Sequence, residues 1–315
     1  MENLIFCLNA TVPIFFTMLL GVFFRKIGLF TEQFVSVLNR FVFSAALPAL
    51  LFEDISNANF LHVWDGRLVL FCFLVTFVSI LISFGFSFLL KDKSIQGEFI
   101  QGSYRSSAAL LGMAFIQNIY GSSAMGPLMI IGTVPLYNVV AVAVLEIMKP
   151  GKKIQDHKKL ILRTLGGIVQ NPIILGILLG VLWSVLRLPK PLVLTQTVHN
   201  LGLLATPLGL MAMGTSFRLD KAAGCLKPAV LCSFLKLIGF TAIFLPLAIH
   251  MGFTQDKLVS ILVMLGSATT VSCFIMAKNM GHDGALSSIV IMLTTVFSAF
   301  TLTGWLYLLK TMNLL

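Results

Sequence analysis

The chain has 315 residues, of which 57% are apolar and only 11% are charged. Soluble globular proteins have about 45–50% apolar and about 25% charged residues, so this composition excludes an ordinary water-soluble domain and indicates an integral membrane protein. The formal net charge is +10, but the basic residues lie between apolar stretches, which is typical of topology signals rather than of nucleic-acid binding. The five cysteines have no spacing that indicates a disulfide framework or a zinc site.

A bilayer core about 30 Å thick requires about 20 mostly apolar residues per helix. The sequence predicts ten such helices, called spans 1 to 10 below, over residues 4–24, 33–52, 68–90, 99–118, 124–148, 161–187, 193–217, 228–250, 256–280 and 285–309. Glu2 stands where a secretory signal would be basic, and no small-residue cleavage motif follows the first apolar stretch. We therefore expect span 1 to be a retained membrane helix.

The basic residues predict the orientation of these spans. With the amino terminus outside, the inner loops hold fourteen Lys and Arg residues and the outer loops hold five. Because basic residues concentrate on the cytoplasmic side, we expect a multi-pass protein of the cell membrane (inner or plasma membrane) with both termini on the non-cytoplasmic side. The Lys-rich segment 149–159 then becomes a cytoplasmic linker that contacts anionic lipid.

The two halves of the chain, residues 1–155 and 156–315, resemble each other. Residues 13–21 (PIFFTMLLG) match residues 172–180 (PIILGILLG) at an offset of 159, which also relates Pro48 to Pro207, and an offset of 161 relates Ser106 to Ser267. Each half has an odd number of spans, so the halves cross the membrane in opposite directions. The predicted fold is an all-α integral membrane domain of two inverted five-helix repeats, an arrangement that is typical of secondary transporters.

Spans 4 and 9 occupy corresponding places in the two repeats and are both rich in small polar residues. Such residues favour local unwinding, and the half-helix amino termini at a break attract anions. The candidate binding residues here are Ser106, Ser107, Gly112, Ser267, Thr269 and Thr270. The alternative is that they form close helix contacts. For Gly176 and Gly180 of span 6, a GxxxG pattern, helix packing is the expected role.

Few ionisable or strongly polar groups lie within the spans, and each is a candidate for function. Arg105 in span 4 and Lys236 in span 8 could offset the charge of an anion or extend to the interface, and Asn138 in span 5 either bonds a neighbouring helix or lines a cavity. Glu146 is the only acid inside the predicted limits apart from the terminal Asp256. The sequence has no metal-ligand cluster, buried carboxylate pair or Walker loop. We expect no cofactor and no enzymatic activity, with coupling to H⁺ or Na⁺ left unassigned.

The order and spacing of several short motifs resemble the auxin efflux carrier family, which includes bacterial malate and malonate permeases. The motifs are Leu38-Asn39-Arg40, residues 46–52 (ALPALLF), Tyr104-Arg105-Ser106-Ser107, Pro135-Leu136-Tyr137-Asn138, Asn171-Pro172, residues 207–210 (PLGL) and 274–278 (FIMAK). The resemblance implies that spans 1, 2, 6 and 7 form a scaffold and that the other spans form a moving domain. Broken spans 4 and 9 would cross at the midplane, in an elevator-like carrier of organic anions. Many relatives have asparagine in place of Ser107 and proline in place of Ala114 and Ala268.

These observations together predict a secondary transporter that moves mono- or dicarboxylates by alternating access. A carboxylate would be bound by Ser107 and by Thr269 or Thr270, with Arg105 or Lys236 offsetting its charge. The alternative function is a membrane receptor or sensor that binds a small organic anion without moving it. The expected partners are the anion and membrane lipid but no nucleic acid, and a homodimer is left open.

Overall fold

The computed structural model of the chain describes residues 13, 16–57, 65–108, 116, 119–120, 125–150, 170–216 and 219–315. Throughout these residues the regular secondary structure is helical, without a strand, as expected for the all-α class. Five of the described helical segments are long and apolar enough to cross a membrane, namely Glu32–Ser56, Gly66–Ser87, Leu128–Ile147, Gly224–His250 and Ala285–Thr311. The apolar helix Pro172–Val185 is shorter.

The first half of the chain starts with a helical segment over residues 16–26. It continues with α2 (Glu32–Phe41), the π-helix η1 (Val42–Ala46), α3 (Leu47–Ser56), α4 (Gly66–Ser87), the 3₁₀ turn η2 (Lys93–Ile95), α5 (Gln96–Tyr104) and α7 (Met125–Ile147). Because α2, η1 and α3 are continuous, span 2 ends at Ser56, four residues beyond the predicted end. This extension places Asp54 inside the helix.

The second half contains α9 (Pro172–Val185), α10 (Leu192–Leu203), α11 (Ala205–Ser216), α12 (Leu219–Phe234), the π-helix η4 (Leu235–Gly239), α13 (Phe240–His250), α14 (Gln255–Gly266), α15 (Ser272–Asn279) and α16 (Ala285–Thr311). The prediction of one unbroken helix for span 7 is wrong at Leu204, where α10 gives way to α11. Pro207 explains the break, since a proline lacks the N–H and its ring collides with the carbonyl four residues earlier. The first part of span 6, residues 161–169, lies outside the described residues.

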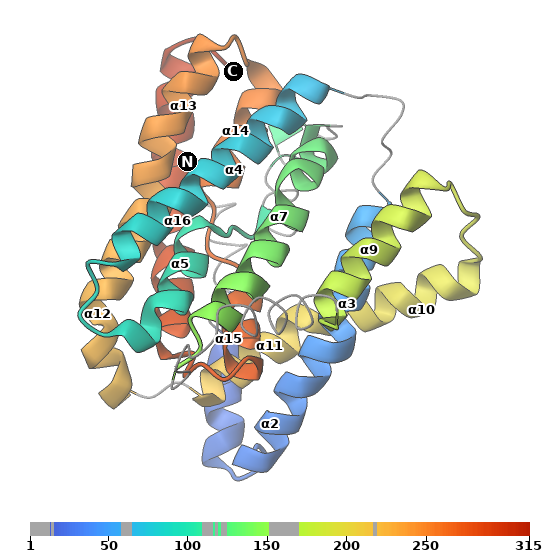
Figure 1. Ribbon diagram of the computed structural model, residues 1–315, viewed down its shortest axis with the longest axis vertical. Coiled ribbons are helices and arrows are strands. Elements are labelled where there is room, and N and C mark those ends of the chain that lie inside the picture. The colour runs from blue at the N-terminus through green and yellow to red at the C-terminus, as the bar shows by residue number, and fades with distance from the viewer. Residues whose placement is uncertain are drawn as a thin grey trace.

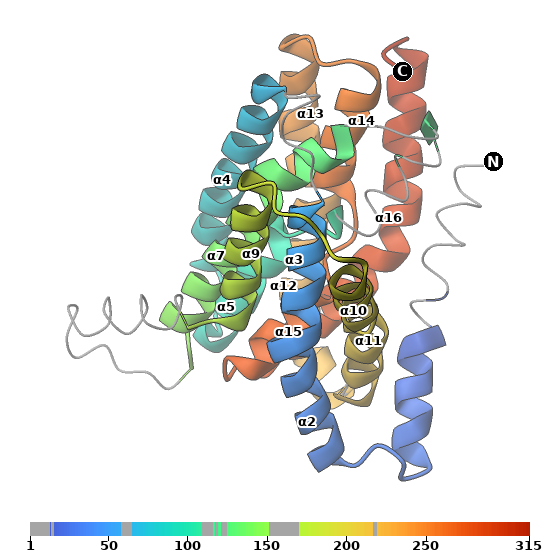
Figure 2. The same cartoon turned by 90° about the vertical axis from the view of Figure 1, so that its right-hand side faces the viewer.

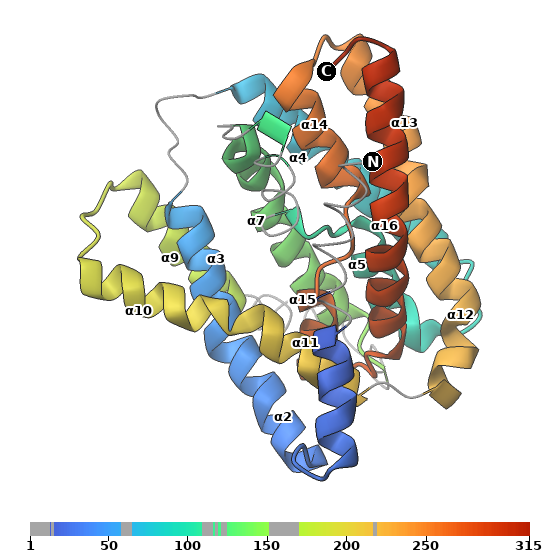
Figure 3. The same ribbon diagram turned by 180° about the vertical axis from the view of Figure 1, so that it is seen from behind.

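The helices form two groups that lie side by side (Figures 1 and 2). In the first, which we call the α3 bundle, α3 packs against α9 and α10, and α2 packs against α11. In the second, the α16 bundle, α12 packs along α16, α4 packs on α5 and α7, and α13 packs on α14 (Figure 3). The short helix α15 contacts α2 and α11 as well as α5 and α16, so it joins the two groups.

Glycines allow the closest helix contacts of the α3 bundle. A Cβ atom on Gly176 would lie 2.6 Å from the carbonyl oxygen of Pro48, and one on Gly180 would lie 3.1 Å from that of Phe52. Gly21 approaches the carbonyl of Met211 in the same manner. Small residues at helix contacts let backbones approach closely in membrane proteins, so the GxxxG pattern of α9 has the packing role expected from the sequence.

Candidate functional site

Span 4 is interrupted directly after α5. The helix ends at Tyr104, and Arg105 has φ −76° and ψ 133°, which is extended backbone. Residues 105–107 are not helical. The following residues 109–115, which include the predicted site residue Gly112 and also Ala114, lie outside the described residues.

Span 9 is interrupted in a similar way between α14 and α15. The helix α14 ends at Gly266, and Ser267 has φ −75° and ψ 161°, so the chain is extended before α15 begins at Ser272. The two breaks touch, because the backbone N–H of Ser107 donates to the carbonyl oxygen of Ala268 at 2.9 Å. The breaks therefore form one contiguous region of extended backbone.

Side chains satisfy the backbone groups that the two breaks release. The carbonyl of Met264 accepts from Ser106 Oγ at 2.6 Å and from Lys236 Nζ at 3.3 Å, and Lys236 Nζ also donates to the carbonyl of Tyr104 at 3.4 Å. The hydroxyl of Thr269 donates to the carbonyl of Gly102 at 2.9 Å. Because non-helical backbone inside a membrane needs such partners, these contacts explain how both helices are interrupted without proline.

Two predicted binding residues, Lys236 and Ser267, lie outside the cavity, and Lys236 is part of the support of the breaks. Lys236 is 1% exposed, lies in the π-helix η4 and holds the carboxyl-terminal ends of α5 and α14, where its positive charge complements the helix dipoles. Ser267 is fully buried and its hydroxyl has no partner among the described residues. Neither side chain lines the cavity described below, so the expected charge-offsetting role of Lys236 next to the anion is not supported by its position.

Arg105 is the predicted residue with the most distinctive environment. It is 2% exposed, and its Nη2 donates at 2.8 Å both to Asn138 Oδ1 and to Ser272 Oγ, while Nη1 donates to Gln101 Oε1 at 3.3 Å and to the sulfur of Met276. All these partners are uncharged, and Nε has no partner among the described residues. A buried charge without an opposite charge is costly, so this guanidinium is suited to bind an anion.

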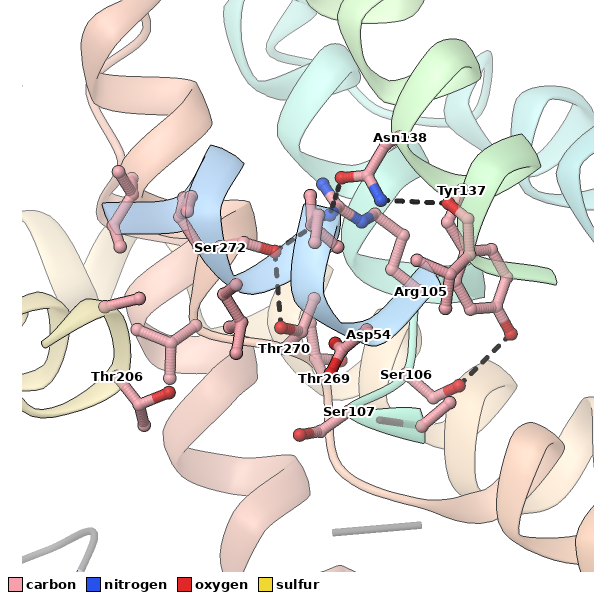
Figure 4. Close-up of a pocket in the computed structure, with 18 of the residues that line it drawn as sticks. Asp54, Arg105, Ser106, Ser107, Tyr137, Asn138, Thr206, Thr269, Thr270 and Ser272 are labelled. Carbon is pink, nitrogen blue, oxygen red and sulfur yellow. Dashed lines mark hydrogen bonds between the residues drawn. The ribbon is translucent and has the colours of Figure 1, made fainter. Parts of the chain in front are cut away.

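A cavity of about 350 Å³ lies beside the two breaks, within the size range of small-molecule sites. Its polar lining comes mainly from the α16 bundle, and Figure 4 shows these side chains gathered around the breaks: Arg105, Ser106, Ser107, Tyr137, Asn138, Thr269, Thr270 and Ser272. The α3 bundle contributes a mostly apolar wall that includes Leu47, Leu50, Leu51 and Ile173. Asp54 and Thr206 are the polar residues of that wall.

The hydroxyl groups at the cavity differ in their availability. Ser106 Oγ donates to Met264 and therefore accepts from the hydroxyl of Tyr137 at 3.1 Å. Thr270 Oγ1 lies 3.2 Å from Ser272 Oγ, and both Thr270 and Ser107 are partly exposed to the cavity. Of the predicted hydroxyl ligands, Ser107 and Thr270 are thus better placed than Thr269 to meet a bound molecule.

Sequence reasoning missed Asp54, because the predicted end of span 2 excluded it. A helical signal could have found it, since Leu47, Leu50, Leu51 and Asp54 are spaced i, i+3, i+4 and i+7 and all line the cavity. The Oδ2 atom of Asp54 is buried and has no hydrogen-bond partner among the described residues. The cavity lining therefore contains a carboxyl group, that of Asp54, as well as the guanidinium of Arg105.

No group of three or more His, Cys, Asp or Glu side chains in the described part of the chain could hold a metal ion. The chemistry available at the cavity is hydrogen bonding and charge pairing by one guanidinium, one carboxylate and several hydroxyl groups. These groups are suited to bind a small polar molecule reversibly.

Membrane-length helices around a cavity that presents polar groups at two interrupted helices define a multi-pass membrane protein of the transporter class. The chain belongs to the membrane transport protein family, whose model matches residues 6–306. The resemblance to the auxin efflux carrier family is thereby confirmed. A Rhizobium meliloti (strain 1021) protein with the name "Putative malonate transporter" is 24% identical over 312 residues, which cover 96% of this chain and 95% of that protein.

Proposed function

We propose that the protein is a secondary transporter that moves small organic anions, mono- or dicarboxylates, across the cell membrane by alternating access. The observation that carries this proposal is Arg105, a buried guanidinium that lines the cavity and whose described partners are all uncharged. A carboxylate is the common anion that matches a guanidinium in shape and charge. Ser107 and Thr270 would donate further hydrogen bonds to it.

Two contacts support the inverted-repeat architecture that we propose for the ten spans. Gly21 packs against Met211, and Gly180 packs against Phe52. Residues 21 and 180 are related by the repeat offset of 159, and so are residues 52 and 211. The hydrogen bond between Ser107 and Ala268 likewise joins residues related by the offset of 161. Contacts that map onto each other in this way are expected of two similarly folded halves.

The distribution of polarity in the cavity supports an elevator-like movement. Most polar lining residues belong to the α16 bundle, whereas the facing wall of the α3 bundle is mostly apolar. Among the described lining residues of the α3 bundle, only Asp54 and Thr206 could make directional contacts with a substrate bound by the α16 bundle. In our proposal the α3 bundle is therefore the scaffold, and the α16 bundle carries the anion past it.

Uptake by sealed vesicles tests this function. We expect purified protein in proteoliposomes to accumulate radiolabelled malonate, the substrate in the name of the Rhizobium relative, with saturation and with competition by unlabelled mono- and dicarboxylates. Protein-free vesicles are the control. A receptor would bind malonate without raising the internal label, so malonate binding without flux would contradict transport and favour the alternative function.

A further inference from the structure

The cavity contains a second charged group that the proposed anion site does not need. Asp54 lines it from the α3 bundle, whereas Arg105 lines it from the α16 bundle. Asp54 Oδ2 is buried without a hydrogen-bond partner among the described residues, and Figure 4 shows the side chain together with the polar residues of the breaks. A buried carboxylate oxygen without a donor is costly. The cavity thus offers one unpaired cationic group and one unpaired anionic group to its occupant.

In the described part of the chain, the surroundings of Asp54 supply no other charge to offset it. The elements packed against α3 are η1, α9 and α10, and neither η1 nor α9 has a titratable side chain. On α10, His199 is paired at 2.8 Å with Glu53, the residue next to Asp54. Lys190, which precedes α10, donates to the carbonyl of Ser56 and to Asn57. Across the cavity the described titratable groups are Arg105 and Tyr137. Asp54 must therefore be neutralised by a proton or by its ligand.

From this geometry we propose that Asp54 is a specificity-determining residue that makes the site bind a dicarboxylate together with one proton. The inference rests on the proposed function. One carboxylate of the substrate pairs with Arg105, and the other meets Asp54. Two carboxyl groups in one site share a single proton, because both cannot be ionised at close range. The proton arrives on the dicarboxylate or is already on Asp54. In both cases the occupied site holds one proton, and the dianion does not bind beside an ionised Asp54.

The pH dependence of malonate uptake tests this inference. At alkaline pH, where free malonate and Asp54 are both ionised, the fraction of either that carries the shared proton falls about tenfold per pH unit. At fixed total malonate we expect wild-type uptake into proteoliposomes to fall by that factor. Asp54→Asn, which keeps the size of the side chain and can donate a hydrogen bond, should accept the dianion, so its uptake should change less than about threefold per pH unit over the same range.

Glu53→Gln is the matched control, because Glu53 is the adjacent acid on α3 and does not line the cavity. We expect this variant to keep the wild-type pH profile. A second measurement needs no variant: malonate added to wild-type protein in weak buffer, within the alkaline range over which uptake falls, should take up about one proton per bound malonate, beyond the amount seen with protein-free micelles.

The outcomes separate this inference from the proposed function. If wild-type vesicles take up malonate but the rate does not fall with pH over the alkaline range, or if Asp54→Asn keeps the wild-type profile, the role of Asp54 is wrong and transport stands. Absence of proton uptake on binding would also overturn it. If wild-type vesicles take up neither malonate nor any competing carboxylate, the proposed function fails and this inference fails with it.

Discussion

The guanidinium of Arg105 is held in position by a hydrogen bond to a side chain that is itself fixed. Asn138 accepts from its Nη2 at 2.8 Å and itself donates from Nδ2 to the carbonyl of Val134 at 2.9 Å. The amide orientation of Asn138 is therefore fixed by α7, and the guanidinium is held in turn by the amide. Such preorganisation lowers the conformational entropy lost on binding. In the proposed function, Asn138 is therefore a positioning residue that holds Arg105 for the anion.

Replacing Arg105 should weaken anion binding more than it weakens the fold. A hydrogen bond to a charged group contributes about 1.5–3 kcal/mol, so we expect Arg105→Gln to raise the half-saturating malonate concentration about 10- to 100-fold in proteoliposome uptake. Arg105→Lys should retain part of the affinity, because it keeps the charge but loses the guanidinium fork.

The control for this prediction is Arg40→Gln, because Arg40 lies on the exposed side of α2 and does not line the cavity. Gel filtration should show that all three variants remain monodisperse. Wild-type malonate kinetics for Arg105→Gln would contradict the assignment of Arg105 as the anion-binding residue.

At the residue scale the sequence was informative where a residue type is unusual for a membrane. Arg105, Ser107 and Thr270 stood out as polar groups within apolar helices, and all three line the cavity. Lys236 stood out for the same reason but holds backbone carbonyls instead. A sequence pattern cannot tell a cation that lines a cavity from one that holds backbone carbonyls, because both are buried. The direction of the side chain distinguishes them.

At the scale of elements, the start of α16 depends on a buried acid from another helix. Glu98 of α5 is 1% exposed and accepts hydrogen bonds of 2.9 Å from the backbone N–H groups of Gly284 and Ser287 and from the hydroxyl of Ser287. A carboxylate at a helix amino terminus satisfies free N–H groups and complements the helix dipole. Glu98 thus joins the interrupted span 4 to the long helix that supports it.

We expect Glu98→Gln to destabilise the protein, because the amide places an N–H group where three donors converge. Loss of a buried charged acceptor costs about 1–3 kcal/mol, which should lower the apparent melting temperature of the detergent-solubilised protein by several degrees. Glu32→Gln is the matched control, since Glu32 is exposed and pairs with Arg25 at 3.5 Å, and such surface pairs contribute little. Equal melting temperatures for the two variants would contradict the capping role of Glu98.

The elements differ in how well the sequence predicts them. The predicted bounds of spans 3, 5 and 10 agree with those of α4, α7 and α16 to within three residues at each end. These helices lie in uninterrupted apolar stretches, which hydropathy and length identify directly. The break at Leu204 and the π-helix at Lys236 escaped prediction. Both are local departures within an apolar stretch, and a hydropathy pattern does not detect them.

At the scale of the whole molecule, the orientation in the membrane remains a prediction from loop charges. It can be tested with single cysteines on a background in which the five native cysteines are replaced. We expect a membrane-impermeant maleimide to label Lys190→Cys, between α9 and α10, in intact cells. Lys91→Cys, between α4 and η2, should be labelled only after permeabilisation, because basic loops stay in the cytoplasm.

Both positions are exposed, so a difference in labelling reports the side of the membrane rather than burial. Labelling of Lys91→Cys but not of Lys190→Cys in intact cells would show that the orientation is opposite to the prediction. The same pair of variants also examines the repeat proposal, because loops that follow spans 3 and 6 should lie on opposite sides if the halves are inverted.

One hydrogen bond between the two interruptions is made by main-chain atoms alone, so it does not depend on which side chains stand there. Ser107 contributes its N–H and Ala268 contributes its carbonyl oxygen, and neither atom depends on side-chain identity. The resemblance places asparagine and proline at these positions in many relatives, and proline keeps its carbonyl although it lacks the N–H. Substitutions at positions 107 and 268 should therefore preserve this hydrogen bond, with one exception: a proline at position 107 would remove the N–H and abolish it.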